Sequence, residues 1–467
     1  MTLTNRSVIT IDDLSNGEIL ALFSLADEMS AAMNKQLGLC RGKIMASLFF
    51  EPSTRTRLSF EAAMHRLGGN VITASDVGAT SLAKEESIAD MARVVGSYAD
   101  IIVIRHPWEG AARVVADYAG VPVINAGDGG HQHPTQTLCD LYTLQKERHT
   151  IKGLKIALWG DLKYGRTIHS LIFALAKFGA DILFCPSPGL EVPEHVINKL
   201  TTEYGGELDR YGTLAQTIKD NLFPLDAIYT TPSQPHQLAM MPDISIQVEL
   251  EKGVDALYVT RPQKERFGTG EEGQELKKRY PVVDKKLLKG KAFQKTLVMH
   301  PLPRVDELAY EVDDDSRSMY FKQAARGVPV RMALLALLLG AREVAIPRED
   351  SPPQIEYPFY RRDSGIRCPN PRCVSIQNTE VKYLKPEFKI VNYQPLTLRC
   401  AYCEHGFEPK YVASSDWHEG RLDTKKYHSA GSHWAKQISP KNLIVFNTED
   451  EAQAHGFKPS QYAGGHR

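Results

Sequence analysis

The chain has 467 residues, and its 56 basic side chains balance its 56 acidic ones, which leaves a formal net charge of zero. The length predicts two or three domains, and the balanced charge argues against a chain-wide field for nucleic acid or a membrane surface. The sequence has neither an apolar run of about 18 residues nor a basic-then-apolar leader, so we expect a cytoplasmic protein without nucleic-acid or membrane partners.

The first part of the chain alternates short apolar strands with amphipathic helices. Residues 11–36 have the apolar spacing of a helix, and strands are predicted at 42–50, 71–74, 100–105 and 121–125. This alternation is typical of a mainly parallel α/β sheet, in which ligands bind beyond the carboxyl ends of the strands.

The stretch after the first strand predicts an anion site. Residues 51–52 interrupt the strand, and Ser53 or Thr54 is a natural N-cap for the next helix. The free N–H groups at a helix N-terminus suit a phosphate. Arg57 is expected to pair with Glu61 on the surface. The residues that open the helix would add hydroxyls and one permanent positive charge: Ser53, Thr54, Arg55 and Thr56.

Polar side chains also follow the later strands. Arg105 ends the third strand beside a proline turn, and His133 and Gln136 stand at the start of a helix after a Gly-rich turn. A neutral imidazole can donate a hydrogen bond to a carbonyl oxygen, and an amide can donate or accept one. These three positions fall at the strand ends where a ligand is expected.

A second α/β domain opens with a strand at 155–159. The loop at 159–167 has glycines for tight turning but lacks a dinucleotide-binding GxGxxG pattern, so no organic cofactor is expected. Arg166 stands at the entrance of the next helix, where a substrate carboxylate would meet both a guanidinium and the helix dipole. A later strand ends in a basic, amide-bearing turn that contains Arg261 and Gln263.

Residues 225–234 echo residues 254–263, with Asp, Ala and Tyr at matching places. Only the second copy carries an arginine, so the binding role is assigned to Arg261. The interval between the two copies is interpreted as an insertion.

Seven cysteines are present. Cys40, Cys139 and Cys185 are scattered in apolar contexts and are expected to be buried thiols. The other four form a Cys-x4-Cys and a Cys-x2-Cys pair, a spacing typical of structural zinc, with disulfides or a nucleic-acid-binding ribbon as alternatives. These proposed zinc ligands are Cys368, Cys373, Cys400 and Cys403.

Residues 49–61 resemble the carbamoyl-phosphate signature of the aspartate and ornithine carbamoyltransferases, and residues 133–136 match a second motif of that family. The resemblance covers about residues 1–345. It implies that carbamoyl phosphate is contacted by Ser53, Thr54, Arg55, Thr56, Arg105, His133 and Gln136, of which Arg55, Thr56, Arg105 and His133 are catalytic.

The polar loop at 80–87 resembles the loop through which the family's aspartate enzymes complete the active site of a neighbouring subunit. Ser81 and Lys84 match its functional residues. The resemblance therefore implies a substrate-binding Ser81, a catalytic Lys84, and a homotrimer with active sites shared between subunits.

Arg166, Arg261 and Gln263 match the residues that hold the aspartate carboxylates in that family. Ornithine enzymes carry a Cys in a later His-x-Leu-Pro motif, whereas this chain has His-Pro-Leu-Pro at 300–303. We expect Pro301 and Leu302, within this motif, to bind substrate.

The expected reaction transfers a carbamoyl group from carbamoyl phosphate to the α-amine of L-aspartate, a step of pyrimidine synthesis. Carbamoyl transfer to ornithine or another amino acid is the alternative within enzymes. A catalytically inactive, zinc-mediated assembly protein is the alternative from another class.

The tail has two segments of its own. The four-cysteine segment resembles the zinc domain of a regulatory chain found with the family's aspartate enzymes, and residues 424–464 faintly resemble a small metal-binding module without its cysteines. The sequence thus predicts two parallel-sheet α/β domains and a zinc-ribbon-like domain. The expected boundaries are 1–149 for carbamoyl phosphate, 150–345 for aspartate with an apolar return helix at 328–342, 346–362 as linker, 363–410 for zinc, and 411–467 as a module of unknown role.

Overall fold

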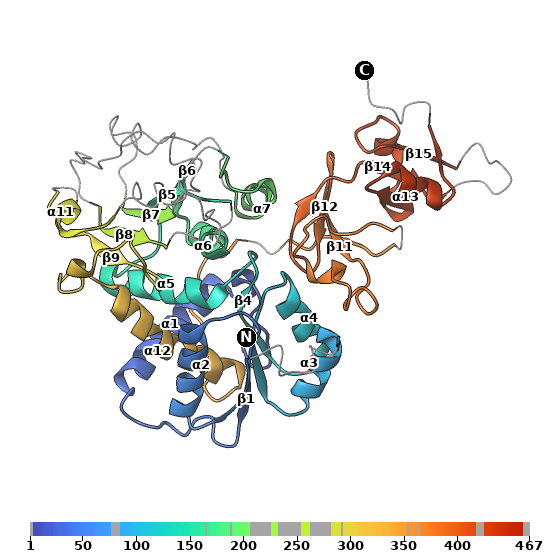
Figure 1. Ribbon diagram of the computed structural model, residues 1–467. Coiled ribbons are helices and arrows are strands. Elements are labelled where there is room, and N and C mark those ends of the chain that lie inside the picture. Colours follow the sequence, from blue (N-terminus) through green and yellow to red (C-terminus); the bar gives the residue numbers. More distant parts are fainter. Residues whose placement is uncertain are drawn as a thin grey trace, which may run out of the picture.

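The computed structural model describes residues 3–75, 85–163, 166–186, 189–205, 226–231, 254–261, 282–290, 293–352, 355–362, 365–416 and 425–460. Figure 1 shows two α/β parts beside each other and a β-rich C-terminal part set to one side. This arrangement agrees with the fold class predicted from the sequence.

The first α/β part is built on a four-stranded parallel sheet in the order β2-β1-β3-β4. Ile101 and Val103 face one apolar core, while Ile102 and Ile104 face another, so both faces of the sheet are covered. The strands are β1 (Ile44–Phe49), β2 (Asn70–Ala74), β3 (Ile101–His106) and β4 (Val123–Asp128). The helices are η1 (Ile11–Asp13), α1 (Asn16–Ala31), α2 (Thr54–Arg66), α3 (Ile88–Gly96), α4 (Ala111–Tyr118) and α5 (Pro134–Arg148).

The predicted helix at 11–36 is wrong at both ends. Residues 11–13 form the separate 3-10 turn η1, and α1 begins only at Asn16. Ser15 caps α1 in a capping box with Glu18, in which each side chain bonds the backbone of the other residue. This cap fixes the start of the helix more strongly than the apolar spacing upstream of it.

The second α/β part has a five-stranded parallel sheet in the order β6-β5-β7-β8-β9. Its strands are β5 (Lys155–Gly160), β6 (Asp181–Pro186), β7 (Ala227–Thr231), β8 (Ala256–Val259) and β9 (Leu297–Met299). Its helices are α6 (Arg166–Lys177), α7 (Glu194–Tyr204), α11 (Lys285–Leu288) and η6 (Tyr310–Val312).

The echoed segments form neighbouring strands of this sheet. β7 pairs with β8 in parallel, with Ala227 opposite Ala256 and Tyr229 opposite Tyr258. The two tyrosine rings stack with centroids 4.4 Å apart. Both copies are thus core strands, and the interval at 232–253, interpreted as an insertion, lies outside the described residues.

The long helix α12 (Tyr320–Leu338) begins well before the predicted start at Val328 and runs through Pro329. It packs against α1, α2 and α5, so the end of the second α/β part returns to the first. Its apolar residues from Val330 to Leu338 are all buried in the large core. Among the described residues, no helix is long and apolar enough to cross a bilayer.

The C-terminal part contains two small sheets. The first has the order β10-β11-β12-β13, and the second β16-β14-β15-β17. Val412, Leu443 and Val445 of the second sheet lie in the same apolar core as the four clustered cysteines. The elements are β10 (Phe359–Tyr360), η7 (Val374–Ile376), β11 (Phe388–Tyr393), β12 (Leu396–Cys400), β13 (Gly406–Phe407), β14 (Tyr411–Ser414), β15 (Lys426–Ser429), η8 (Ala435–Gln437), η9 (Pro440–Asn442), β16 (Leu443–Phe446), α13 (Glu449–Ala454) and β17 (Lys458–Pro459).

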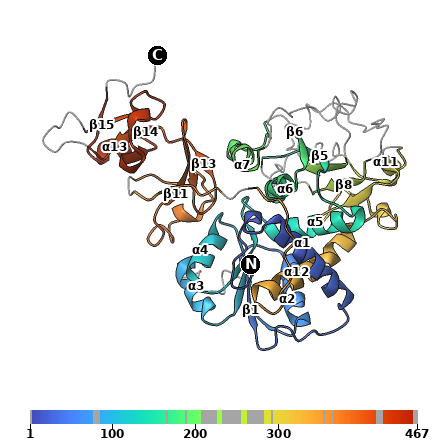
Figure 2. The same ribbon diagram turned by 180° about the vertical axis from the view of Figure 1, so that it is seen from behind.

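The C-terminal part contacts both α/β parts, and Figure 2 shows it beside α4 and α7. The backbone of Glu109 makes two hydrogen bonds to it: its N–H donates to Arg372 at 2.9 Å, and its carbonyl accepts from Val374 at 2.9 Å. Arg399 forms an ion pair with Glu203 of α7. The four-cysteine region is therefore docked on the rest of the chain.

Candidate functional site

The N-terminus of α2 forms one wall of the site. Strand β1 ends at Phe49, and α2 begins at Thr54 with Ser53 at the N-cap position, as predicted. Ser53 makes no side-chain capping bond, which leaves the first N–H groups of the helix for a ligand. Arg57 lies 3.7 Å from Glu61, in the expected surface pair.

A cavity of about 570 Å³ opens between the two α/β parts. It is lined by the start of α2, the ends of β3 and β8, the start of α5 and the loop after β9. The structure therefore brings together residues that the sequence separates by more than 200 positions. The predicted site residues that line it are Ser53, Thr54, Arg55, Thr56, Arg105, His133, Gln136, Arg261, Pro301 and Leu302.

Arg55 and Arg261 approach this cavity from opposite α/β parts. Burial and then the positive charge of Arg261 lower the pKa of the Arg55 guanidinium. Like charges that share a cavity repel each other, and an anion placed between them relieves that repulsion. The electrostatics of the cavity thus favour an anionic ligand.

Arg105 is buried at the end of β3. Its Nη1 donates to the Ala126 carbonyl at 3.3 Å, and its Nη2 lies 3.3 Å from the Glu51 carboxylate. Gly127 has φ +116°, and a Cβ there would lie 3.1 Å from Arg105 Nη1 and 3.3 Å from His133 Cδ2. A side chain at position 127 would therefore crowd both functional groups.

His133 is the N-cap residue of α5. Its Nδ1 accepts a hydrogen bond from the backbone N–H of Gln136 at 3.3 Å, so the neutral ring carries its proton on Nε2. Nε2 is thus the ring atom that can donate to a carbonyl oxygen in the cavity. The backbone N–H of His133 donates to Ser170 Oγ of α6 at 2.9 Å, which ties this loop to the second α/β part.

Asp140 supports the site, although no motif points to it. Its carboxylate accepts hydrogen bonds from Gln136 Nε2 at 2.8 Å, Gln323 Nε2 at 2.7 Å and Tyr258 OH at 3.0 Å. Burial raises the pKa of Asp140 to about 7, against the lowering effect of these donors. The available signal was its i,i+4 spacing from Gln136 on α5.

Arg331 was also not anticipated. It is 4% exposed and lines the cavity from α12. Its guanidinium lies 4.9 Å from the centre of the Phe60 ring, and its Nη1 donates to Cys139 Sγ at 3.5 Å. The signal that could have found it is an arginine inside an otherwise apolar helix, because a buried charge is costly without a function or a partner.

The loop at 301–303 is held by His300, which lies beneath it. His300 Nδ1 accepts from the backbone N–H of Leu302 at 2.8 Å, and its Nε2 bonds the buried carboxylate of Glu307 at 2.8 Å. Burial lowers the pKa of His300, against the raising effect of Glu307. His300 thus fixes Pro301 and Leu302 at the edge of the cavity.

Three predicted site residues, Ser81, Lys84 and Gln263, lie outside the described residues. Arg166 is placed by its backbone as the first residue of α6, and its side chain is likewise outside the described part. The neighbouring Thr167 lines the cavity, so the start of α6 faces it.

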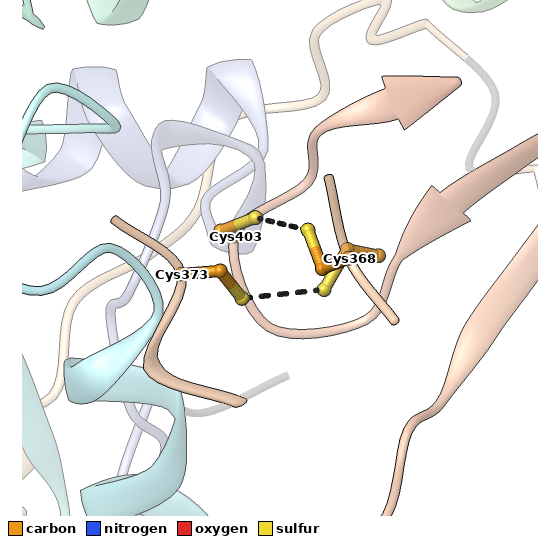
Figure 3. Close-up of side chains that lie close together, drawn as sticks. Cys368, Cys373 and Cys403 are labelled. Atoms are coloured by element: carbon orange, nitrogen blue, oxygen red, sulfur yellow. Dashed lines mark hydrogen bonds between the residues drawn. The ribbon is translucent and has the colours of Figure 1, made fainter. Parts of the chain in front are cut away.

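The four late cysteines form a second, separate site. Their sulfurs lie within 4.8 Å of one another, and all four side chains are buried. Figure 3 shows Cys368, Cys373 and Cys403 turned toward one another. The Sγ atoms of Cys368 and Cys403 are 3.6 Å apart, and those of Cys373 and Cys400 are 3.7 Å apart.

These sulfur separations exclude disulfides, which require about 2.05 Å. They fit the edges of a tetrahedron, since a zinc–sulfur distance of about 2.3 Å places sulfurs about 3.8 Å apart. Four thiol ligands, all buried and with these sulfur separations, therefore suit a structural metal. The three remaining cysteines, Cys40, Cys139 and Cys185, are buried and free, as predicted.

The cavity between the two α/β parts is a pocket suited to small anionic ligands, because ligand sites form preferentially between domains and arginine side chains concentrate anions. Residues 6–146 match the profile of the aspartate/ornithine carbamoyltransferase carbamoyl-P binding domain, and residues 236–338 match that of its Asp/Orn binding domain. Residues 363–413 match the metal binding domain of the aspartate carbamoyltransferase regulatory chain.

Curated relatives agree with these profiles. The aspartate carbamoyltransferase catalytic subunit of Thermoplasma acidophilum is 46% identical over 340 residues, covering 72% of this chain and 99% of its own length. That of Methanocaldococcus jannaschii is 45% identical over 341 residues, covering 72% and 99%. The chain therefore belongs to the aspartate/ornithine carbamoyltransferase family.

Solved structures resemble 72% of the chain as well. The catalytic subunit of M. jannaschii aspartate transcarbamoylase superposes with a TM-score of 0.57 at 44% identity, covering 72% of this chain and 98% of that one. Aspartate transcarbamoylase from Trypanosoma cruzi, in complex with N-(phosphonacetyl)-L-aspartic acid, has a TM-score of 0.57 at 36% identity, with 72% and 97% covered.

Proposed function

We propose that this chain transfers the carbamoyl group of carbamoyl phosphate to the α-amine of L-aspartate, giving N-carbamoyl-L-aspartate and phosphate. The observation that carries the proposal is the convergence of Arg55, Arg105 and Arg261 in one cavity. Both substrates are anions near neutral pH, so they meet only where cations offset their repulsion. The curated relatives, which are named as catalytic subunits for this reaction, support the same assignment.

Carbamoyl phosphate binds with its phosphate at the N-terminus of α2. The backbone N–H groups there, the hydroxyls of Ser53 and Thr54 and the Arg55 guanidinium hold the phosphate oxygens. When the amine attacks the carbamoyl carbon, negative charge develops on the carbonyl oxygen. Thr56, Arg105 and His133 Nε2 donate hydrogen bonds to that oxygen. The bond between the carbamoyl carbon and the phosphate oxygen then breaks, the amine gives up a proton that the leaving phosphate accepts, and phosphate departs with its charge already paired.

The second substrate binds nearer to the second α/β part. Arg261, with Arg166 and Gln263, holds the carboxylates of aspartate, and Gln136 is held by Asp140 in reach of the carbamoyl group. The loop at 301–303 closes that side of the cavity. Catalysis rests on orienting the two substrates and on fixed positive charge.

The decisive assay offers carbamoyl phosphate with aspartate, ornithine or putrescine in parallel. Carbamoylaspartate formed in excess over the other products supports the proposal. Transfer to ornithine would establish the alternative enzyme, and no transfer to any amine would establish the inactive assembly protein.

We further propose that the active unit is a cytoplasmic homotrimer, with Ser81 and Lys84 completing the site of a neighbouring subunit. Mixing inactive Lys84→Ala and His133→Ala proteins tests the shared site, because mixed trimers contain some sites without either substitution. Recovered activity supports sharing, and a mixture that stays inactive contradicts it.

The four cysteines hold a structural Zn²⁺ in this proposal. Four thiolates close the coordination shell, so the metal supplies folding free energy and takes no part in carbamoyl transfer. Elemental analysis that finds one zinc per chain supports this, and a folded protein without bound metal contradicts it.

A further inference from the structure

The loop at 128–133 separates two cavities. His133 and Gln136 face the substrate cavity described above, whereas Gly130, His131 and Gln132 line a second cavity of about 620 Å³ behind it. The far wall of the second cavity comes from α7 and from the zinc domain, through Asn370, Cys403, Glu404 and His405. The zinc domain thus reaches the back of the loop that carries His133.

Glu404 makes the contact with this loop. One of its carboxylate oxygens, Oε2, lies 3.2 Å from His131 Nε2 and 3.0 Å from Gln132 Nε2. Both carboxylate oxygens lie 3.1 Å from the Nζ of Lys199 in α7, which in turn pairs with Asp12 at 2.7 Å. A single zinc-domain side chain therefore joins the catalytic loop to a helix of the second α/β part.

His131 is held between two carboxylates. Its Nδ1 lies 2.9 Å from Asp128 and its Nε2 faces Glu404. Burial would lower the pKa of His131, but Asp128 and Glu404 raise it to about 10. The ring is thus a cation that donates from both nitrogens, so its role is to fix the loop rather than to exchange a proton.

The contacts of Glu404 with His131 and Gln132 also restrain the next residue, His133. Gln132 precedes His133, and its backbone carbonyl accepts from Asp128 at 3.3 Å while its side chain is bound by Glu404. The backbone N–H of His133, which shares a peptide group with that carbonyl, donates to Ser170 Oγ. The position of the His133 ring therefore depends on where Glu404 holds residues 131 and 132.

The backbone conformation of Glu404 also indicates a functional side chain. Its φ is +56°, in the left-handed region that favours glycine and disfavours a side chain. Residues in such conformations tend to be kept where their side chain has a function. Here the side chain spans the junction of three parts of the protein.

We propose that Glu404 is a positioning residue for carbamoyl transfer, which holds His133 through His131 and Gln132. The proposal rests on the function proposed above. It assigns the fused zinc domain a role in the geometry of the active site, in addition to its own folding.

The test compares Glu404→Gln with wild type in steady-state carbamoylaspartate formation. Glu404→Gln keeps the shape of the side chain and leaves Lys199 paired with Asp12. We expect kcat to fall about tenfold or more, since small displacements of a catalytic group have effects of this size. KM for carbamoyl phosphate should stay within twofold, because its phosphate is bound by α2 and Arg55. This split would not follow from a general loss of stability.

Glu387→Gln is the matched control. Glu387 lies in the same domain, and its carboxylate pairs with Arg361 rather than with the loop at 128–133. A normal kcat in Glu387→Gln and a reduced kcat in zinc-loaded Glu404→Gln support the proposal. A kcat for Glu404→Gln within twofold of wild type, or an equal loss in both variants, overturns it.

If Glu404→Gln fails to fold or to retain zinc, Gln132→Leu is the deciding variant. It removes the hydrogen bond to Glu404, together with a longer one of 3.4 Å from the Ile11 backbone N–H, without changing any charge. A lower kcat with unchanged KM then supports the proposal, and wild-type kinetics overturn it. Wild-type protein assayed alongside separates the two questions, since its inactivity would refute the proposed function itself.

Discussion

Replacing Arg55 by alanine should separate activity from stability. The Arg55 guanidinium lines the substrate cavity at the N-terminus of α2, where it would hold the phosphate through charge-assisted hydrogen bonds. Loss of one such preorganised donor typically costs about 2.7–4 kcal/mol of barrier, which corresponds to a fall in kcat of roughly 100- to 1,000-fold. We expect Arg55→Ala to lose activity in this range.

The same substitution should leave the stability of the folded protein unchanged or raise it slightly. Burial and the charge of Arg261 both lower the pKa of Arg55, so the folded protein is destabilised by a positive charge at this position. Removing that charge relieves the repulsion. The free energy of unfolding should therefore stay within about 0.5 kcal/mol of wild type or rise slightly.

The assay measures carbamoylaspartate formation at saturating aspartate, together with urea unfolding of the same preparations. Arg57→Ala is the control, since Arg57 lies on the same helix but pairs with Glu61. It should keep kcat within about twofold. An Arg55→Ala protein that is folded and has near-normal kcat would refute the reasoning, as would equal losses in the two variants.

Three further outcomes are expected. Gly127→Ala should lower the free energy of unfolding by about 1 kcal/mol or more, because φ at this position is +116°. It should also lower kcat, because the new Cβ crowds Arg105 and His133. Urea unfolding and steady-state kinetics measure the two effects. Removal of the proposed zinc with a chelator should unfold the four-cysteine region, seen as lost hydrogen-exchange protection at Val374. Asp140 has a folded pKa of about 7, above its unfolded value of 3.8, so its contribution to stability falls as pH rises between these values. Asp140→Asn should abolish that pH-dependent difference, which reaches up to about 4 kcal/mol between pH 4 and 8.

Much of the substrate cavity could be predicted because local sequence encodes its parts. A helix cap after a buried strand predicted the position of Ser53, and residues at other strand ends, such as Arg105 and Arg261, lie at the same cavity. The carboxyl ends of parallel strands meet at one edge of a sheet, so chain order predicted that Ser53 and Arg105 lie close together. That Arg261, on the second sheet, faces the same cavity was implied only by the resemblance to the carbamoyltransferases. The start of α1 was misjudged, because the capping box at Ser15 overrides the apolar spacing before it.

The supporting residues could not be predicted in this way. Asp140 contacts Gln323, which lies on a helix far along the chain, and Glu404 contacts a loop in another domain. Such contacts depend on how distant elements pack against each other, and the spacing of residues along the sequence does not predict that packing. The start of α12 illustrates the same limit: the helix was predicted from Val328, but it begins at Tyr320 and continues through Pro329 into a buried core.

The covalent link between the docked four-cysteine domain and the rest of the chain keeps the two in contact at any dilution. Residues 363–413 match the metal binding domain of a regulatory chain, and a domain held by non-covalent contacts alone would separate from the catalytic part on dilution. Here the tether keeps the domain at an effective concentration on the order of millimolar, whatever the amount of protein in solution. The contacts of Glu109 and Glu404 should therefore persist in a single molecule diluted without limit.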